Sequence, residues 1–353
     1  MAPSATSPVT AEDALPAPIH PSFIPKLDKD FIEYYNAHVG NVKSTHEVTI
    51  KDIRAFPAKY ASVWYKDYSY EPFVKDIKIT ADDGHVFTAR IYNPDPSTSP
   101  FGDGPYPIHI NFHGGGFTFG GLEGDAELCM TVRTQVGVML MDVDYRLSPE
   151  HDYGKGHDDC WAAVKWVREH GSEINARSDS ISIGGISAGG TISAVIQQQA
   201  RDIGLPLKLA FLGVPLVASH MYIKEPEESP YPSMVENALA PTLSWSRLKY
   251  FQSHYTTKSA EEKAALEARG VFFSDPVDGD LEGLCPTFIA TAEADPLRDE
   301  GEEYGARLAK AGVKTTLRRY TGVPHPFMHM RPIKKAVMYV EDYCSAVKQA
   351  HGA

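Results

Sequence analysis

The sequence predicts an α/β protein built on a mostly parallel sheet. From residue 108 onward, short uninterrupted apolar runs alternate with amphipathic segments, a pattern typical of parallel strands covered by helices on both faces. Before that point, residues 74–80 and 86–92 alternate in polarity on either side of an Asp-Asp-Gly turn, which indicates two antiparallel strands. With 353 residues, 42% of them hydrophobic and 23% charged, the chain is long enough to bury a large core.

Eight strands and four core helices are expected. After the antiparallel pair, the expected strands are 108–112, 138–143, 181–184, 209–213, 287–291 and 315–320. The expected helices, which lie between or after these strands, are 158–170, 188–203, 300–311 and 333–350. The positions expected to face the core in the first and last helices are Cys160, Val164, Val167, Val337, Val340, Cys344 and Val347. Right-handed crossovers should join the parallel strands.

Two stretches lie outside this alternation. Residues 27–39 carry aromatic side chains at helical spacing behind an acidic first turn. About 70 residues separate the fourth and fifth parallel strands, far more than an ordinary connection needs, so we expect an insertion with helices at 243–254 and 260–268.

The chain therefore divides into four parts. Residues 1–20 are small, polar and Pro-rich, which predicts a disordered tail. Residues 21–72 and the insertion 216–275 are expected to form two parts of one helical cap. Residues 73–215 and 276–353 are expected to form the α/β core.

Composition excludes several classes of partner. Arg and Lys number 34 against 46 Asp and Glu, a net charge of −12, so neither a nucleic acid nor an anionic lipid surface is expected to bind. The sequence has no secretory signal and no apolar run of the ~18 residues that a membrane span requires. We expect a cytoplasmic protein without a membrane span, and the oligomeric state stays open between a monomer and a homodimer.

A serine motif follows the strand 181–184 directly. Gly185-Ile186-Ser187-Ala188-Gly189 stands where a strand passes through a sharp turn into a helix, which is the context of a nucleophile elbow. The flanking glycines are needed because side chains there would collide with neighbouring elements. Such a pentapeptide arises by chance about once in seven chains of this composition, so a simple Gly-rich turn is the alternative.

A second glycine motif is more specific. His113-Gly114-Gly115-Gly116-Phe117 follows the strand 108–112, and its chance occurrence is under about one per cent. Backbone N–H groups in such a loop can converge on a developing oxyanion. A phosphate-binding loop is the alternative, but no Lys-Ser or Lys-Thr pair follows the glycines.

A nucleophilic serine requires a base and an acid that orients it, and in this kind of sheet the chain order is serine, acid, histidine. Asp295 follows the strand 287–291, and His325 follows the strand 315–320, so both lie where parallel strands end. Glu293 and Asp299 compete with Asp295, and His329 competes with His325.

No metal site is predicted. The four cysteines are far apart and are interpreted as reduced, mostly buried thiols; they are Cys129, Cys160, Cys285 and Cys344. His325 and His329 lie in a Pro-rich stretch without a carboxylate to complete a zinc site. His151 and His157 are interpreted as loop and surface residues.

Five motifs together resemble the hormone-sensitive lipase family of α/β-hydrolases. They are His113-Gly-Gly-Gly-Phe117, Asp144-Tyr-Arg-Leu-Ser-Pro-Glu-His151, Gly185-Ile-Ser-Ala-Gly-Gly190, Asp295-Pro-Leu-Arg-Asp299 and His325-Pro-Phe327. The resemblance runs from about residue 70 to the C-terminus. It implies an α/β-hydrolase fold with an eight-stranded twisted sheet and a helical cap.

The resemblance also implies roles for individual residues. Ser187 would be the nucleophile, His325 the base and Asp295 the acid that orients it. The N–H groups of the oxyanion hole would belong to Gly115, Gly116 and Ala188, while His113 and Gly114 support this motif and Gly114 is the weaker donor candidate. No cofactor is implied.

Three departures from the family pattern concern the walls of the site. Ile186 stands where the family usually has an acidic residue, and Pro326 stands where it usually has glycine. Residues 151–157 contain no proline, whereas the family tends to place more prolines there. None of these changes removes a reacting group, so all three bear on the class of substrate.

The leading hypothesis is a serine hydrolase that cleaves small to medium apolar carboxylic esters through an acyl-enzyme, with the small-molecule ester as its partner. The same three residues could instead act on an amide, a formamide, a lactone or a biosynthetic intermediate. A non-catalytic receptor is the remaining alternative, as in the plant gibberellin receptors, which resemble this family but have lost the histidine. The two cap stretches carry ten large apolar or aromatic residues, of which most are expected to form the core of the cap and a minority to face the serine. They are Phe23, Phe31, Tyr34, Tyr35, Met221, Tyr222, Tyr231, Leu243, Trp245 and Phe251.

Overall fold

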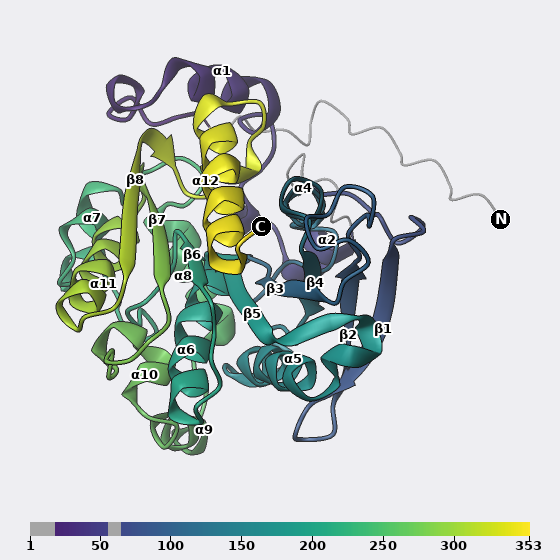
Figure 1. Ribbon diagram of the computed structural model, residues 1–353. Helices are drawn as coiled ribbons and strands as arrows, with labels where there is room; N and C mark the ends of the chain where they lie inside the picture. The colour runs from purple at the N-terminus through teal and green to yellow at the C-terminus, as the bar shows by residue number, and fades with distance from the viewer. Residues whose placement is uncertain (1–17, 56–64) are drawn as a thin grey trace.

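The computed structural model describes residues 18–55 and 65–353. Eight strands form one sheet in the order β1-β2-β4-β3-β5-β6-β7-β8 (Figure 1). The strands are β1 (Val74–Thr80), β2 (Val86–Tyr92), β3 (Tyr106–Phe112), β4 (Met139–Asp144), β5 (Ala176–Ile186), β6 (Ala210–Gly213), β7 (Thr287–Ala294) and β8 (Thr315–Pro324). β2 runs antiparallel to β1 and β4, and all other neighbours are parallel, which confirms the expected fold class.

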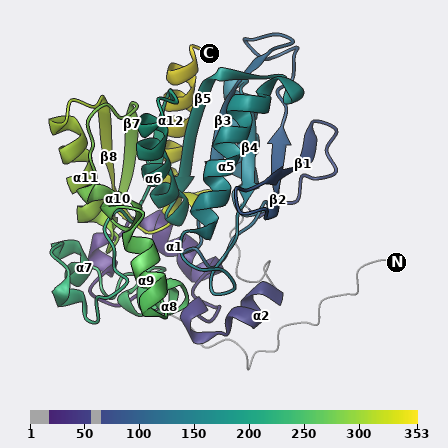
Figure 2. The ribbon, with the colours of Figure 1, turned by 90° about the horizontal axis from the view of Figure 1, so that it is seen from below.

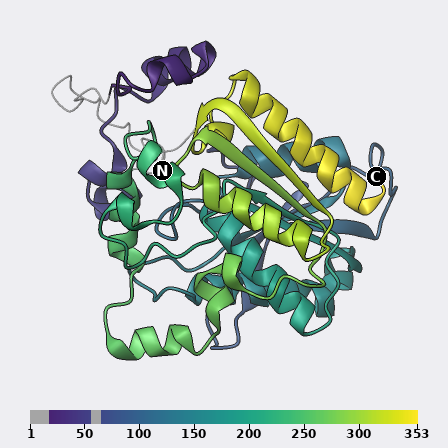
Figure 3. The same ribbon diagram turned by 90° about the vertical axis from the view of Figure 1, so that its left-hand side faces the viewer.

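Helices cover both faces of the sheet. One face carries α5 (Lys155–His170), α6 (Ala188–Asp202) and α11 (Arg298–Lys310), and the other carries α4 (Ala126–Val136) and α12 (Lys334–His351). Figure 3 shows α12, in yellow, on the opposite side of the sheet from α11. The sequence pattern predicts no helix between the first two parallel strands, whereas α4 occupies this stretch and ends at Gly137 in the left-handed conformation (φ 75°).

The strands have apolar residues on both faces because each face packs against helices. On the face that meets α5 and α6, β3 contributes Ile108, Ile110 and Phe112. On the other face, the ring of Phe211 stacks on Phe288 with centroids 4.5 Å apart and also meets the aromatic rings of α12. The core is therefore two apolar layers separated by the sheet.

Two expectations about single residues are wrong. Val337 is 40% exposed, because Tyr339 and Tyr343 of α12 are the residues that pack inward next to Val340. His157 is buried within α5, where its ring stacks on Phe117 at 5.5 Å, so it is not a surface histidine. Burial lowers the pKa of His157 to about 3.

The four cysteines carry free thiols, and three of them are buried. None of the helices in the described part of the chain combines the length and the apolar character needed to cross a bilayer.

The remaining helices belong to the N-terminal segment and to the insertion. The N-terminal helices are η2 (Ile24–Lys26), α1 (Lys29–His38), η3 (Thr45–Glu47) and α2 (Ile50–Ala55). The helices of the insertion are η5 (Pro226–Glu228), α7 (Pro232–Glu236), α8 (Trp245–Tyr255), α9 (Ala260–Glu267) and α10 (Val271–Ser274). Two further short helices, η4 (Gly171–Ile174) and η6 (Pro276–Asp278), lie in connections of the core, and η7 (Phe327–His329) follows β8.

The two stretches expected to form the cap approach each other. Figure 2 shows α1, α2, α7 and α8 at the same end of the sheet, and the Tyr250 hydroxyl of α8 donates a hydrogen bond to the Val48 carbonyl (3.2 Å). The division into tail, cap and core stays a prediction, and residues 1–17 and 56–64 lie outside the described residues.

A chain of buried polar groups joins β3, β5 and α12. His109 Nδ1 lies 2.8 Å from Ser182 Oγ, which in turn lies 2.7 Å from His351 Nε2. The other ring nitrogens meet Tyr343 Oη (2.7 Å) and Ser180 Oγ (2.9 Å). Burial lowers the pKa of His109 to about 3 and that of His351 to about 4, so both rings are neutral in the folded protein.

This network predicts a pH-dependent stability. An unfolded histidine binds a proton below pH ~6.5, whereas the buried rings bind one only near pH 3–4, so the free energy of unfolding should fall as the pH drops below ~6.5. His351→Gln should make that slope shallower by at most about 1.4 kcal/mol per pH unit. Urea unfolding midpoints measured between pH 4.5 and 7.5 test this.

The matched control is His38→Gln, because His38 is exposed on α1. That variant should keep the slope of the parent protein. An unchanged slope in His351→Gln would contradict the prediction.

Candidate active site

Ser187 occupies a strained turn between β5 and α6. Its backbone has φ 57° and ψ −117°, a conformation that is costly for a residue with a side chain and is typical of functional sites. A Cβ at Gly185 would lie 2.2 Å from the Phe112 carbonyl oxygen, and one at Gly189 would lie 1.8 Å from the same atom. The turn is therefore possible only because both flanking positions lack side chains.

Three residues that the sequence places far apart form one hydrogen-bonded chain. His325 Nε2 lies 2.9 Å from Ser187 Oγ, and His325 Nδ1 lies 2.9 Å from Asp295 Oδ2. Asp295 is 1% exposed and His325 is 5% exposed. The other oxygen of Asp295 accepts the N–H of Leu297 (2.9 Å), which fixes the carboxylate. The three residues follow β5, β7 and β8, at the carboxyl ends of parallel strands.

The rival residues have other partners. Glu293 accepts the N–H of Gly322 (2.7 Å), and Asp299 accepts the N–H of Ser233 (2.7 Å) at the start of α7. His329 Nε2 lies 2.8 Å from Asp125 Oδ1. These contacts tie loops together, and the structure gives none of the three residues a contact with Ser187.

The glycine loop after β3 lies beside Ser187. A Cβ built on Gly114 would be 3.7 Å from the Ser187 Cβ and 2.9 Å from the Ile186 carbonyl oxygen. Gly115 and Gly116 have φ values of 125° and 60°, which glycine adopts readily. Among the described residues, the backbone N–H groups of Gly115, Gly116 and Ala188 have no hydrogen-bond acceptor. Three backbone donors near the serine are thus unused.

Packing and hydrogen bonds of His113 hold the glycine loop in place. The ring of His113 stacks on Tyr145 with centroids 4.1 Å apart, and the Tyr145 hydroxyl donates to the His113 carbonyl (2.7 Å). His113 Nδ1 lies 2.8 Å from the Gly114 carbonyl oxygen, and burial lowers the pKa of the imidazole. A Cβ on Gly120 would lie 2.1 Å from His113 Nδ1, so this glycine leaves room for the ring.

The insertion contacts two loops of the site. They are the glycine loop, residues 113–117 after β3, and the histidine loop, residues 325–329 after β8. The Thr242 hydroxyl donates to the backbone carbonyl of His325. Phe251 of α8 fills the space beside Gly116, where a Cβ would lie 2.5 Å from its ring. Phe119 meets Phe251 at 5.7 Å and Tyr250 at 6.2 Å, so aromatic rings form one wall near the glycine loop.

Asp125 and Thr242 are contacts of the histidine loop that sequence reasoning missed. Asp125, just before α4, holds His329, which follows His325 by four positions. Neither residue belongs to a recognisable motif, and both lie more than 80 positions from their partners. Only a three-dimensional arrangement could have revealed them.

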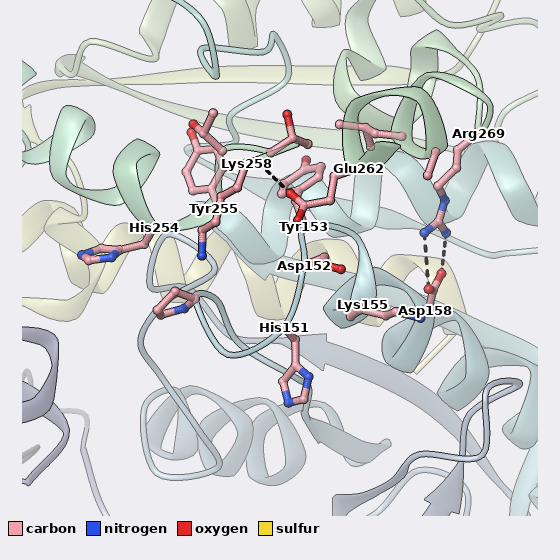
Figure 4. A pocket seen from close by; sticks show the side chains of 15 residues that line it. His151, Asp152, Tyr153, Lys155, Asp158, His254, Tyr255, Lys258, Glu262 and Arg269 are labelled. Atoms are coloured by element: carbon pink, nitrogen blue, oxygen red, sulfur yellow. Dashed lines mark hydrogen bonds and ion pairs between the residues drawn. The ribbon is translucent and has the colours of Figure 1, made fainter. Parts of the chain in front are cut away.

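A separate pocket of about 190 Å³ lies between the segment 149–158 and the segment 254–269 of the insertion (Figure 4). Its wall includes Tyr153 and Tyr255, whose rings are 5.2 and 5.4 Å from the Phe117 ring. The ion pair between Arg269 and Asp158 also lines it. Ser187 is not among the lining residues, so this pocket is distinct from the site of the hydrogen-bonded chain.

In the part of the chain that the structure describes, no group of three or more His, Cys, Asp or Glu side chains is arranged to hold a metal ion. The groups that lie together at Ser187 are a serine hydroxyl, an imidazole, a carboxylate and backbone N–H groups. This set suits nucleophilic attack on a carbonyl followed by proton transfer.

Comparisons with known proteins show which proteins this chain is similar to. A family model described as alpha/beta hydrolase fold matches residues 109–329. Esterase LipI of Mycobacterium tuberculosis is 36% identical over 257 residues, which cover 72% of this chain and 75% of the relative. An arylesterase of Saccharolobus solfataricus is 30% identical over 72% of this chain and 76% of its own length. A solved structure, a hyperthermophilic esterase from the archaeon Pyrobaculum calidifontis, superimposes with a TM-score of 0.79 at 28% identity and covers 93% of this chain and 100% of that one.

The hydrogen-bonded chain predicts the reactivity of Ser187. A fluorophosphonate should label this serine stoichiometrically, because His325 is placed to take its proton. His325→Gln should slow labelling at least about 100-fold. Intact-mass spectrometry over time, with peptide mapping of the adduct, measures both the rate and the site.

The rival histidine provides the matched control. His329→Gln should slow labelling much less, since His329 contacts Asp125 instead of the serine. Labelling at another serine, or equal slowing in the two variants, would overturn the assignment.

Proposed function

The chain belongs to the hormone-sensitive lipase-type carboxylesterase family of the α/β-hydrolase fold and is a carboxylic ester hydrolase, and on this premise we propose that Ser187 is its nucleophile. The observation that carries the proposal is the chain of two 2.9 Å contacts from Ser187 through His325 to Asp295. In this arrangement, the serine hydroxyl attacks the ester carbonyl and forms an acyl-enzyme.

His325 moves the proton in both halves of the reaction. With Nδ1–H donated to Asp295, Nε2 carries a lone pair and accepts the Ser187 proton as the oxygen attacks. The resulting imidazolium then protonates the leaving alcohol. Water repeats the cycle on the acyl-enzyme, and Asp295 stabilises the positive charge each time it forms.

The unused N–H groups beside the serine would hold the oxyanion. Gly115, Gly116 and Ala188 offer backbone donors that need no rearrangement as negative charge develops. Ala188 also begins α6, so the positive end of the helix dipole faces the same point. His113 and Gly114 act indirectly, by fixing the loop.

The cap is proposed to select the substrate. Phe251 and Phe119 supply an apolar wall beside the glycine loop, which favours apolar esters of small to medium size. Relatives named ethyl acetate hydrolase and arylesterase support a preference in this range. Residues 21–72 and 216–275 would together form this cap.

Ser187→Ala should abolish turnover of p-nitrophenyl esters, by at least about 10⁴-fold, while leaving the fold intact. Rates across acyl chain lengths, aryl esters, lactones and amides should be highest for short to medium esters. Activity retained by Ser187→Ala would refute the nucleophile. Equal rates for long triglycerides would contradict the proposed size preference.

Gly116→Ala tests the glycine loop. The added Cβ would press on the Phe251 ring and strain a backbone at φ 60°, so the donor should move and kcat should fall about 10²–10³-fold. Gly84→Ala is the matched control, because φ is 85° but nothing lies within 4 Å. It should lose some stability and keep its kcat, and similar losses of kcat in both variants would falsify the explanation.

A further inference from the structure

The guanidinium of Arg247 is a cation near the site, and no carboxylate of the described residues pairs with it. Its Nη1 donates to the Thr242 carbonyl (2.5 Å), while its Nε is buried and has no acceptor. Among residues 18–55 and 65–353, no Asp or Glu forms an ion pair with this guanidinium. Buried donors without acceptors are rare in native proteins and require an explanation.

Few titratable groups face Arg247. They are the phenols of Tyr35 in α1 and Tyr250 in α8 and the imidazole of His46 in η3, whose pKa is lowered by burial. The guanidinium carbon of Arg247 lies 5.8 Å from the centre of the Phe251 ring. Burial lowers the pKa of Arg247 to about 10, which leaves the side chain protonated at neutral pH. Within the described part of the chain, this cation therefore has no carboxylate partner.

The contacts of Arg247 place its positive charge between the histidine loop and the glycine loop. On one side, Thr242 accepts from Arg247 through its carbonyl and donates through its hydroxyl to the His325 carbonyl. On the other side, Phe251 separates the guanidinium from Gly116. A single residue therefore lies between Arg247 and each loop: Thr242 on the side of the histidine loop and Phe251 on the side of the glycine loop.

We propose that Arg247 binds a carboxylate carried by the substrate, so that the preferred esters are apolar near the reacting carbonyl and anionic at one end. The proposal rests on the proposed function, because the ester must react at Ser187. The Nε–Nη2 edge of a guanidinium matches the two oxygens of a carboxylate, and an anion here would give Nε the acceptor that it lacks among the described residues. Hydrolysis of such an ester gives an alcohol and a carboxylic acid, and the carboxylate that Arg247 binds stays on one of these two products.

Matched ester pairs test the proposal. 4-Carboxyphenyl acetate and 4-carbamoylphenyl acetate share the acyl group and the ring, and they differ only in the charge on the alcohol part. Monomethyl adipate and methyl adipamate make the same comparison on the acyl part. The parent protein should favour the anionic member of at least one pair in kcat/KM. Arg247→Gln should reduce that preference about 10- to 100-fold, mainly through KM, and Arg247→Lys should keep part of it.

The outcomes separate this inference from the proposed function. Lys263→Gln removes a cation from α9 of the same insertion, where Lys263 is exposed beside Glu267, and it should leave the preference unchanged. If the parent protein cleaves the neutral esters but favours neither anionic member, the inference fails and the proposed function stands. Equal losses on charged and neutral esters in Arg247→Gln would assign Arg247 to holding Thr242, and would also overturn the inference. Turnover retained by Ser187→Ala would instead refute the proposed function.

Discussion

The close approach of β3, β5 and α6 at Ser187 is the constraint on which the rest of the site depends. The Phe112 carbonyl oxygen occupies the space that side chains at Gly185 and Gly189 would need. This packing forces a left-handed backbone on a serine and lifts its oxygen to the carboxyl end of the sheet. The ends of β7 and β8 supply Asp295 and His325 at hydrogen-bond distance, so this local crowding determines where the three side chains meet.

The histidine loop is held from two directions. Asp125 of the core binds His329, and Thr242 of the insertion binds the backbone of His325. A histidine in a loop has many orientations available, and two anchors reduce them before any substrate arrives. Thr242 and Asp125 each lie more than 80 residues along the chain from the histidine that they hold.

Most of the fold could be predicted from local sequence patterns, and so could the identities of Ser187, His325 and Asp295, which form the hydrogen-bonded chain. Strands and core helices have strong periodicity, and Ser187 stands in a motif with a defined strand-turn-helix context. The pattern did not reveal α4, whose apolar positions follow a Gly-rich loop closely, nor the burial of His157, which depends on rings from Phe117 and Phe273. The net charge likewise could not show that Arg247 has no carboxylate partner in the described part of the chain, because ion pairing is decided by tertiary contacts.

The hydrogen bond between Thr242 and the His325 carbonyl has a consequence for protein engineering. Residues 240–243 are attractive positions for a library meant to widen the range of accepted esters, because they belong to the insertion. Any such library would also vary the orientation of the imidazole. Selection for a new substrate at these positions would therefore act on two properties together, and variants would need separate readouts of affinity and of proton transfer.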